Sequence, residues 1–325
     1  MYKRFYDLKQ NPFENTPDPA FLCATKKHNE ALAALYYGVK RRKGFVMLTG
    51  EVGTGKTLVV RCLLKILDRA SVAYAYVFNP RLTPIEFLQY IAGDLHLPTA
   101  GKSKSELLLD LSTYLIERHH KRLITVLVVD EAHHLSADVL EEIRLLTNLE
   151  TGDGKLLQIV LVGQQELDEK IDRVDLRQLK QRIALRAKLS SLDLEESQAY
   201  IYRRLQLVGC SNPAEIFPIE TITEIYQQSR GLPRLLNTIC ENALIHGYAA
   251  QTRTLFPAVI ETIAADFRLN VEHPREAEDT VSRETSEVTK AAQTLIDLYM
   301  RLRGMHDDGA ELPTRVPIGV RSHIR

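Results

Sequence analysis

The chain has no tryptophan and only four cysteines in 325 residues. Cys23, Cys62, Cys210 and Cys240 are too scattered for a CxxC metal knuckle and too few for a disulfide scaffold, which fits a reducing compartment. No apolar run approaches the ~20 residues that a membrane helix needs. The opening residues, MYKRFYDLKQNPF, lack the apolar core of a signal peptide. We therefore expect a cytoplasmic protein that neither spans a membrane nor is secreted.

Net charge is also absent, because 42 Lys and Arg residues balance 42 Asp and Glu residues. No global field draws the chain to nucleic acid or acidic lipid, so such binding would need a local patch. Basic residues do cluster at 40–43, 119–122 and 177–188. Without interleaved aromatic residues, we favour solvated faces over a nucleic-acid surface for these clusters.

Short apolar runs alternate with helical patterns over the first 190 residues. The runs that predict strands lie at 45–49, 71–78, 123–130, 156–163 and 183–190. Helical spacing follows at 28–42, directly after residue 57, and at 83–94, 103–118 and 136–149, with Ser136 as the N-cap of the last. Unbroken β-branched runs that alternate with helices are typical of a parallel sheet covered on both faces. We predict an α/β fold with a parallel five-stranded sheet.

Beyond about residue 192 the strand signals stop and helical spacing takes over. Helices are predicted at 194–207, 219–228, 233–250 and 258–267. A polar, charged stretch at 271–286 is typical of a solvated linker, and residues 288–303 have one apolar helical face. The predicted organisation is an N-terminal segment with the α/β domain over 1–192, a small helical domain over 193–270, and a linker with an amphipathic helix and tail over 271–325.

A glycine-rich octapeptide follows the first apolar run and matches the pattern GxxxxGK[ST]. In this pattern bare backbone N–H groups wrap a phosphate chain, and the next helix points its positive end at it. Lys56 would neutralise the β- and γ-phosphate oxygens, and Thr57 would hold Mg²⁺. A purely structural glycine turn is disfavoured, because the motif lies between a strand and a helix. The residues predicted to bind ATP are Gly50, Glu51, Val52, Gly53, Thr54, Gly55, Lys56 and Thr57.

Two carboxylates end the apolar run LITVLVVD. Asp130 is placed to hold the metal, directly or through water, and Glu131 is placed to polarise the attacking water. Read without the glycine-rich loop, the pair could equally be helix-capping or solvated residues. His133 and His134 invite a metal site, but HExxH is absent, so we expect surface or interface histidines.

These motifs lie in stretches that resemble the AAA+ ATPase superfamily and, within it, the general secretion pathway protein A (ExeA) family. The resemblance runs from about residue 5 to 268. The stretches that carry it are FYDLKQNPFENTPDPAFL, GFVMLTGEVGTGKT, VLVVDEAHHLSADVLEEIRLLTNLE, IVLVGQQEL, LRQLKQRI and GLPRLLN. The family often has Gln where His133 stands, which leaves the acidic pair intact. The resemblance implies a P-loop ATPase domain followed by a helical lid.

The resemblance also implies roles for polar residues outside the two motifs. Gln164 resembles sensor 1, and Arg234 resembles sensor 2, carried by the lid; Pro233 would place Arg234 beside the positive end of a helix. Arg182 resembles the arginine finger that a neighbouring subunit inserts, with Arg177 as the reserve. Asn79 resembles the polar switch residue that restrains the catalytic Glu, although a turn-forming Asn fits equally well.

The function implied by the resemblance is Mg²⁺-dependent ATP hydrolysis by a homo-oligomeric ring or filament. The partners would belong to a secretion, pilus or exopolysaccharide export apparatus, served from the cytoplasm or peripherally at the inner membrane. The alternative is a DNA-bound ATP switch similar to transposition regulators of the TniB and TnsC type, against which the neutral net charge argues. A third alternative, a nucleotide-bound scaffold without hydrolysis, requires Glu131 to be idle.

Overall fold

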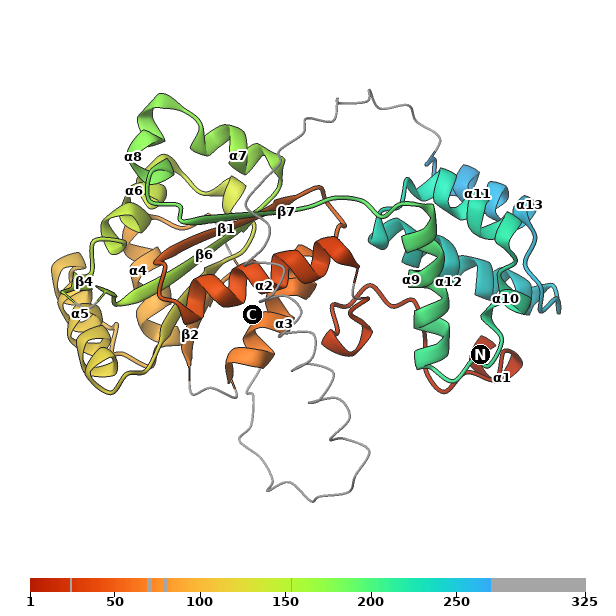
Figure 1. Ribbon diagram of the computed structural model, residues 1–325, viewed down its shortest axis with the longest axis horizontal. Coiled ribbons are helices and arrows are strands. Elements are labelled where there is room, and N and C mark those ends of the chain that lie inside the picture. The colour runs from red at the N-terminus through yellow and green to blue at the C-terminus, as the bar shows by residue number, and fades with distance from the viewer. Residues whose placement is uncertain (24, 69–71, 79–80, 153, 270–325) are drawn as a thin grey trace, which may run out of the picture.

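The structure, a computed structural model, describes residues 1–23, 25–68, 72–78, 81–152 and 154–269. The predicted linker at 271–286 and the predicted helix at 288–303 lie outside these residues. The described chain forms an α/β body and a helical body, which lie side by side in Figure 1.

Five parallel strands form the sheet of the α/β body, as predicted from the apolar runs. In spatial order they are β2 (Ala73–Val77), β3 (Thr125–Val129), β6 (Leu157–Gly163), β1 (Phe45–Gly50) and β7 (Leu185–Leu189). Because all five run the same way, their carboxyl ends meet at one edge, where open α/β sheets bind ligands. A short hairpin of β4 (Glu150–Thr151) and β5 (Gly154–Lys155) was not predicted.

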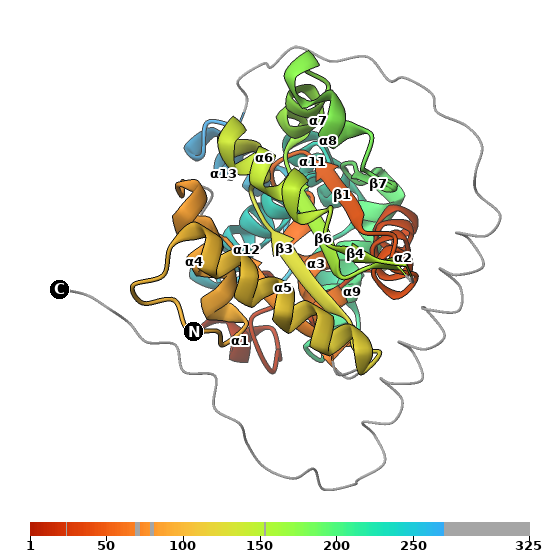
Figure 2. The same cartoon turned by 90° about the vertical axis from the view of Figure 1, so that its left-hand side faces the viewer.

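Helices cover both faces of this sheet, with α4 and α5 on one side and α2 on the other (Figure 2). Successive strand residues point to opposite faces, so Phe45 and Met47 pack into one core and Val46 and Leu48 into the other. The helices of the first core are α4 (Pro84–Asp94), α5 (Lys104–His120) and α6 (Ala137–Leu146), and those of the second are α2 (Lys26–Lys40) and α3 (Lys56–Asp68). Burial on both faces explains why the three central strands, β1, β3 and β6, are almost continuous apolar runs.

Side-chain caps fix where several of these helices begin. Ser136 accepts a hydrogen bond from the Val139 N–H and is the N-cap of α6, which confirms the prediction. The helices α4 and α5 begin with capping boxes, Thr83 with Glu86 and Ser103 with Glu106.

Helices alone form the second body. They are α9 (Leu194–Leu207), α10 (Pro213–Ile216), α11 (Ile219–Ser229), α12 (Pro233–Ala249) and α13 (Pro257–Asp266). The first residues of the chain, with α1 (Tyr2–Phe5), pack into the same core through Tyr2, Tyr6 and Phe13. The Phe13 ring meets the Phe217 ring edge to face at 6.1 Å. The sequence analysis grouped this segment with the α/β domain, but the structure packs it against the helical body.

The helical body joins the α/β body shortly after β7. The Leu192 N–H donates to the Gly231 carbonyl at 2.9 Å. Gly231 has φ +70°, and a Cβ there would lie 1.9 Å from the Leu192 carbonyl oxygen. Only glycine therefore allows these two backbone segments to lie this close.

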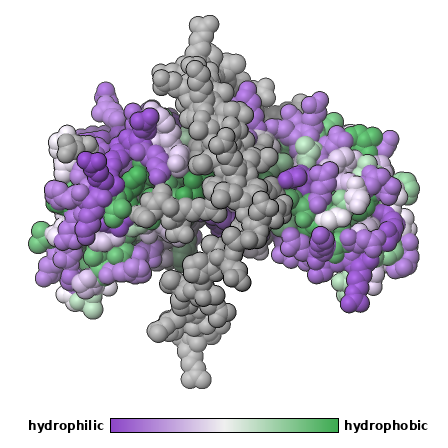
Figure 3. Space-filling model, turned by 60° about the horizontal axis from the view of Figure 1, so that its bottom comes forward, coloured by the Kyte–Doolittle hydropathy of each residue, from purple (hydrophilic) through white to green (hydrophobic). Residues whose placement is uncertain are grey.

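The surface visible in Figure 3 is mostly hydrophilic on both bodies, with scattered hydrophobic patches. Among the described residues, no helix combines the length and the apolar character needed to cross a membrane.

Candidate functional site

The glycine-rich loop connects β1 to α3 at the carboxyl edge of the sheet. Gly53 and Gly55 have φ of +84° and +95°, values that residues with a Cβ rarely adopt. A Cβ on Gly53 would lie 2.9 Å from the Arg234 Cβ, and one on Gly55 would lie 3.1 Å from the His28 Nε2. The glycines thus let the loop curl while other elements pack closely against it.

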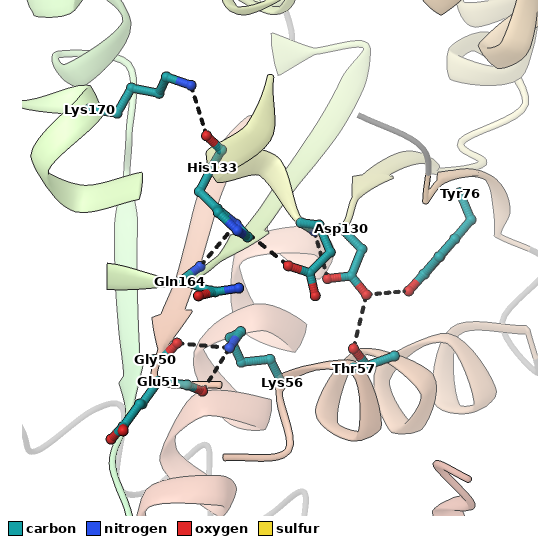
Figure 4. Close-up of polar contacts among 10 residues, drawn as sticks. Gly50, Glu51, Lys56, Thr57, Tyr76, Asp130, His133, Gln164 and Lys170 are labelled. Carbon is teal, nitrogen blue, oxygen red and sulfur yellow. Dashed lines mark hydrogen bonds and ion pairs between the residues drawn. The ribbon is translucent and has the colours of Figure 1, made fainter. Parts of the chain in front are cut away.

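Lys56 lies at the centre of this loop (Figure 4). Its Nζ donates to the carbonyls of Gly50 at 2.8 Å and Glu51 at 2.9 Å. Burial lowers the pKa of Lys56, while the charges of Glu131 and Asp130 act in the opposite direction. The ammonium therefore lies in the loop within the field of the two predicted catalytic carboxylates.

A histidine that was not predicted as a site residue forms a hydrogen bond to the backbone of the loop. His28, on the first turn of α2, donates from Nε2 to the Thr54 carbonyl at 2.9 Å, and its Nδ1 accepts the Thr25 hydroxyl at 2.7 Å. Because a carbonyl only accepts, Nε2 carries a proton, and in the neutral ring Nδ1 accepts from the Thr25 hydroxyl. Burial lowers the pKa of His28, so the neutral form is favoured at neutral pH.

Asp130 follows β3 and is 5% exposed. Its Oδ1 accepts the Glu131 backbone N–H at 2.9 Å. Its Oδ2 accepts the Thr57 hydroxyl at 3.0 Å and the Tyr76 hydroxyl at 2.7 Å. Burial, followed by the charge of Asp130, raises the pKa of Tyr76, so the phenol stays protonated and donates. The structure thus joins the two predicted metal residues, Thr57 and Asp130, and adds Tyr76.

Glu131 has a left-handed backbone with φ 52°, a conformation that costs a non-glycine residue energy and recurs at functional sites. The hydrogen bond from its N–H to Asp130 holds it there. Its side chain is 44% exposed and lines the same pocket as Lys56. The carboxylate is therefore open to water beside the loop.

The expectation was of surface or interface histidines, and the side chain of His133 is only 6% exposed within this chain. It lies in the turn η2 (Ala132–His134), where its Nδ1 accepts the Gln164 N–H at 3.4 Å and lies 3.5 Å from the Glu131 carboxylate. Burial lowers the pKa of His133. Because the Nδ1 of a neutral His133 accepts the Gln164 N–H, this nitrogen carries no proton. It therefore cannot donate a hydrogen bond to the Glu131 carboxylate, which lies 3.5 Å away.

The structure brings the Glu131 carboxylate beside the two histidines, although the sequence lacks the HExxH pattern of a metal site. One donor atom each of Glu131, His133 and His134 lies within 4.8 Å of the others. The rings of His133 and His134 lie 4.0 Å apart between centroids and are tilted by 41°, and His134 is exposed.

Lys170, on α7 (Gln165–Ile171), ties this turn to the next helix. Its Nζ donates to the carbonyls of His133 at 2.8 Å and Leu135 at 2.6 Å. The predicted helices did not include α7, whose seven residues are too few for a clear helical period.

The pocket beside the loop has a volume of about 300 Å³ and is lined by both bodies. Gln164, at the end of β6, and Arg234, on the first turn of α12, both line it. The Arg234 N–H donates to the Gly53 carbonyl at 3.2 Å. Both predicted sensor residues therefore lie at the same pocket as Lys56 and Glu131.

Residues 12–17, which we call the N-terminal strap, cross between the two bodies along this pocket. On the helical side the Asn237 side-chain amide donates to the Asn15 side chain at 3.3 Å. On the α/β side Arg61 of α3 donates to the Pro17 carbonyl at 2.7 Å. The strap therefore links the helix that follows the loop to the helical body.

Arg204 of α9 holds the strap and is buried. It donates to the carbonyls of Pro12 at 2.9 Å and Glu14 at 3.3 Å. Its guanidinium lies 5.0 Å from the Phe21 ring and 5.1 Å from the Tyr200 ring, two cation–π contacts. Nothing in the local sequence around Arg204 marked this role.

Residues 39–171 match the family described as AAA domain. The chain is also 44% identical over 250 residues to the general secretion pathway protein A of Aeromonas hydrophila, an alignment that covers 77% of this chain and 45% of that protein. This chain carries an AAA domain. It spans less than half the length of the Aeromonas relative.

Solved structures with the same fold include Drosophila ORC bound to DNA, with a TM-score of 0.63, 20% identity, and coverage of 82% of this chain and 66% of that one. The ORC2 protein of Aeropyrum pernix, in its ADPNP–ADP complexes, matches with a TM-score of 0.61, 17% identity, and coverage of 79% and 72%. At these identities the likeness concerns the P-loop NTPase fold.

The two arginines predicted as fingers lie away from the pocket of their own AAA domain. Arg177 begins α8 (Arg177–Lys180), after the turn η3 (Val174–Leu176), and Arg182 precedes the start of β7; both are exposed. Neither has an ion pair among the described residues, whereas neighbouring cations do. Those pairs are Arg173 with Asp175, Lys180 with Asp172, and Arg186 with Asp168. Asn79 lies outside the described residues.

The residues of the AAA domain fit a nucleotide with a divalent cation. The glycines leave backbone close to the pocket, Lys56 supplies a cation, and the Thr57 hydroxyl and Asp130 carboxylate supply the hard oxygens that Mg²⁺ prefers.

Proposed function

We propose that the protein is a Mg²⁺-dependent ATPase. The observation that carries this proposal is that Lys56, Thr57, Glu131, Gln164 and Arg234 all line one pocket. They come from three strand ends and from the helical body, and the AAA domain match supports a shared nucleotide site.

Each side chain has a task that follows from its position. Lys56 neutralises phosphate oxygens, and Thr57 with Asp130 holds the metal, which when bound offsets the charge that builds up on the phosphates. Glu131, exposed beside the loop, accepts a proton from the attacking water or orients it. Arg234, whose N–H donates to the Gly53 carbonyl, contacts the phosphates of the nucleotide from the helical body. The helical body then acts as a lid.

The test is phosphate release by the wild-type protein and Glu131→Gln. Loss of a general base costs typically ~10²–10⁴-fold, so we expect the rate to fall by at least about 100-fold while a fluorescent ATP analogue still binds. Lys56→Ala should abolish that binding. Equal rates in wild type and Glu131→Gln would instead remove Glu131 from the mechanism, and nucleotide binding without phosphate release by the wild type would support the nucleotide-bound scaffold.

We also propose that the working form is a homo-oligomer with a site completed by a neighbour. The hydrogen bond and charge of Lys155 lower the pKa of the Glu150 carboxyl, and the charge of Arg182 adds a smaller effect of the same sign. An exposed cation outside its own pocket is suited to the pocket of another subunit.

The relation to general secretion pathway protein A supports a role in assembling a secretion, pilus or exopolysaccharide export system, in the cytoplasm or peripherally at the inner membrane. Cells whose only copy carries Lys56→Ala should then lose the exported product, while their level of this protein stays unchanged. Normal export in those cells would exclude this role.

A second candidate is a DNA-bound ATP switch, and one observation favours it. Two basic clusters, 40–43 and 119–122, lie together in the fold, because Arg42 contacts the His119 Nδ1 at 2.6 Å and donates to the Leu123 carbonyl at 3.0 Å. A gel-shift titration with ATP at two salt concentrations tests it, since binding through phosphates weakens steeply with salt. Binding that is absent at low salt would exclude the DNA switch.

A further inference from the structure

The Asp130 carboxylate is surrounded by three hydrogen-bond donors. Its Oδ1 accepts the Glu131 N–H, and its Oδ2 accepts the Thr57 hydroxyl at 3.0 Å and the Tyr76 hydroxyl at 2.7 Å, as Figure 4 shows. An ionised carboxylate has about four lone-pair sites. Both sites of Oδ2 are therefore occupied, and one site of Oδ1 remains.

The Tyr76 hydroxyl is held in place by the sheet. Tyr76 pairs with Val128 in the register of β2 and β3. Its N–H donates to the Asp94 side chain at 2.7 Å, which anchors the edge strand to the end of α4. The ring packs, partly buried, against the second core of the sheet. Its hydroxyl therefore reaches Asp130 from a fixed backbone.

A carboxylate in this state is poorly prepared to bind a cation directly. A direct bond through Oδ2 would displace a hydroxyl donor, whereas a metal-bound water can donate to the remaining Oδ1 site. Mg²⁺ dehydrates reluctantly and keeps several waters, whereas Ca²⁺ takes six to eight oxygen ligands, carboxylates included. We propose that Tyr76 is a positioning residue that keeps Asp130 in contact with the cation through water, and so makes the site prefer Mg²⁺ over Ca²⁺. This inference rests on the proposed function.

The experiment is a titration of nucleotide binding with metal, read from a fluorescent ATP analogue. Mg²⁺ or Ca²⁺ is added to the full chain of the wild type, Tyr76→Phe and Tyr74→Phe. Tyr74 lies two residues earlier on the same strand, is exposed, and serves as the matched control. We expect the ratio of Mg²⁺ to Ca²⁺ affinity to fall about fivefold in Tyr76→Phe, the size of one net hydrogen bond, and to stay unchanged in Tyr74→Phe.

Electron paramagnetic resonance of bound Mn²⁺ gives a second readout that does not depend on activity. The wild-type complex should hold more water ligands on Mn²⁺ than the Tyr76→Phe complex. An unchanged metal ratio in Tyr76→Phe, or an equal shift in the control, overturns the role of Tyr76. A direct Asp130 ligand in wild type overturns it even if the variant does not fold. Absence of nucleotide binding to the wild type would overturn the proposed function itself.

Discussion

At the residue scale, His28 shows how a side chain without a direct chemical role shapes the site. It joins the first turn of α2 to the Thr54 carbonyl, so the glycine-rich loop is supported from the helix that precedes its strand. Burial favours the neutral ring, in which Nε2 donates to Thr54 while Nδ1 accepts from the Thr25 hydroxyl.

His28 should therefore make stability depend on pH. Its pKa is below the ordinary 6.5 in the folded protein, so the unfolded chain binds the proton more tightly. The free energy of unfolding should fall as pH drops below about 7 and through the folded pKa. Urea unfolding between pH 8 and pH 5.5 measures this effect.

The control is His28→Gln, whose amide can donate to Thr54 but does not titrate. It should lose less stability than the wild type over the same range, although His133 contributes with the same sign in both proteins. Parallel curves for the two proteins would show that His28 is not the group responsible.

At the element scale, the N-terminal strap is the piece that the two bodies share. Arg204 holds it from α9 and Arg61 holds it from α3, and Glu14 and Pro17 line the pocket. A movement of either body should therefore shift the N-terminal strap, which lines the pocket.

Arg204→Met should release the strap, because two backbone carbonyls lose a charged donor, each bond being worth roughly 1.5–3 kcal/mol. We expect the lysine-specific endoprotease Lys-C to cut at Lys9 sooner, and the fluorescent ATP analogue to bind more weakly. Arg203→Met changes the exposed neighbour on the same helix and should behave like the wild type. Identical cleavage in both variants would mean that Arg204 does not hold the strap.

The sequence predicted the helices and strands whose hydrophobic pattern or capping residue can be recognised from neighbouring residues alone. All five strands are confirmed, but only β1, β3 and β6 are apolar runs buried on both faces, whereas the edge strands β2 and β7 are partly exposed. The helix α6 begins at Ser136 because a hydroxyl caps it locally. The short elements α7, α8 and α10 were missed, because four to seven residues hold too little of a helical period.

The residues of the candidate site likewise fall into those that local motifs predicted and those that only the folded structure brings together. Lys56 and Asp130 were predicted because motifs at strand ends must meet at one sheet edge; their roles stay predictions. His28 and Thr54 are 26 residues apart, and Arg204 and Pro12 are 192 apart. Such contacts depend on how the two bodies pack, which no local pattern encodes. Tyr76 was missed because its strand pattern AYAYV does not distinguish it from Tyr74.

At the scale of the whole molecule, the proposed role of Arg182 in the pocket of a neighbouring subunit would make activity depend on assembly. Turnover per subunit should rise with protein concentration. Arg182→Ala and Lys56→Ala should each be inactive alone, yet a mixture should recover part of the activity, because one kind of interface then has both an intact pocket and an intact arginine. Phosphate release from mixtures of varied ratio measures it.

The same experiment with Arg177→Ala distinguishes the two arginines. If Arg182→Ala stays active alone, while Arg177→Ala is inactive alone and recovers in the mixture, Arg177 is the contributing residue. If neither mixture recovers, each subunit works independently.

The contact between Leu192 and Gly231 decides where the molecule can bend. Since the two backbones are bonded and packed without room for a methyl group, Leu192 must travel with the helical body. We expect any rotation of that body to pivot upstream, in the exposed pair Ser190 and Ser191 just after β7. A proline at either serine should then restrict this rotation while leaving the residues that line the pocket in place.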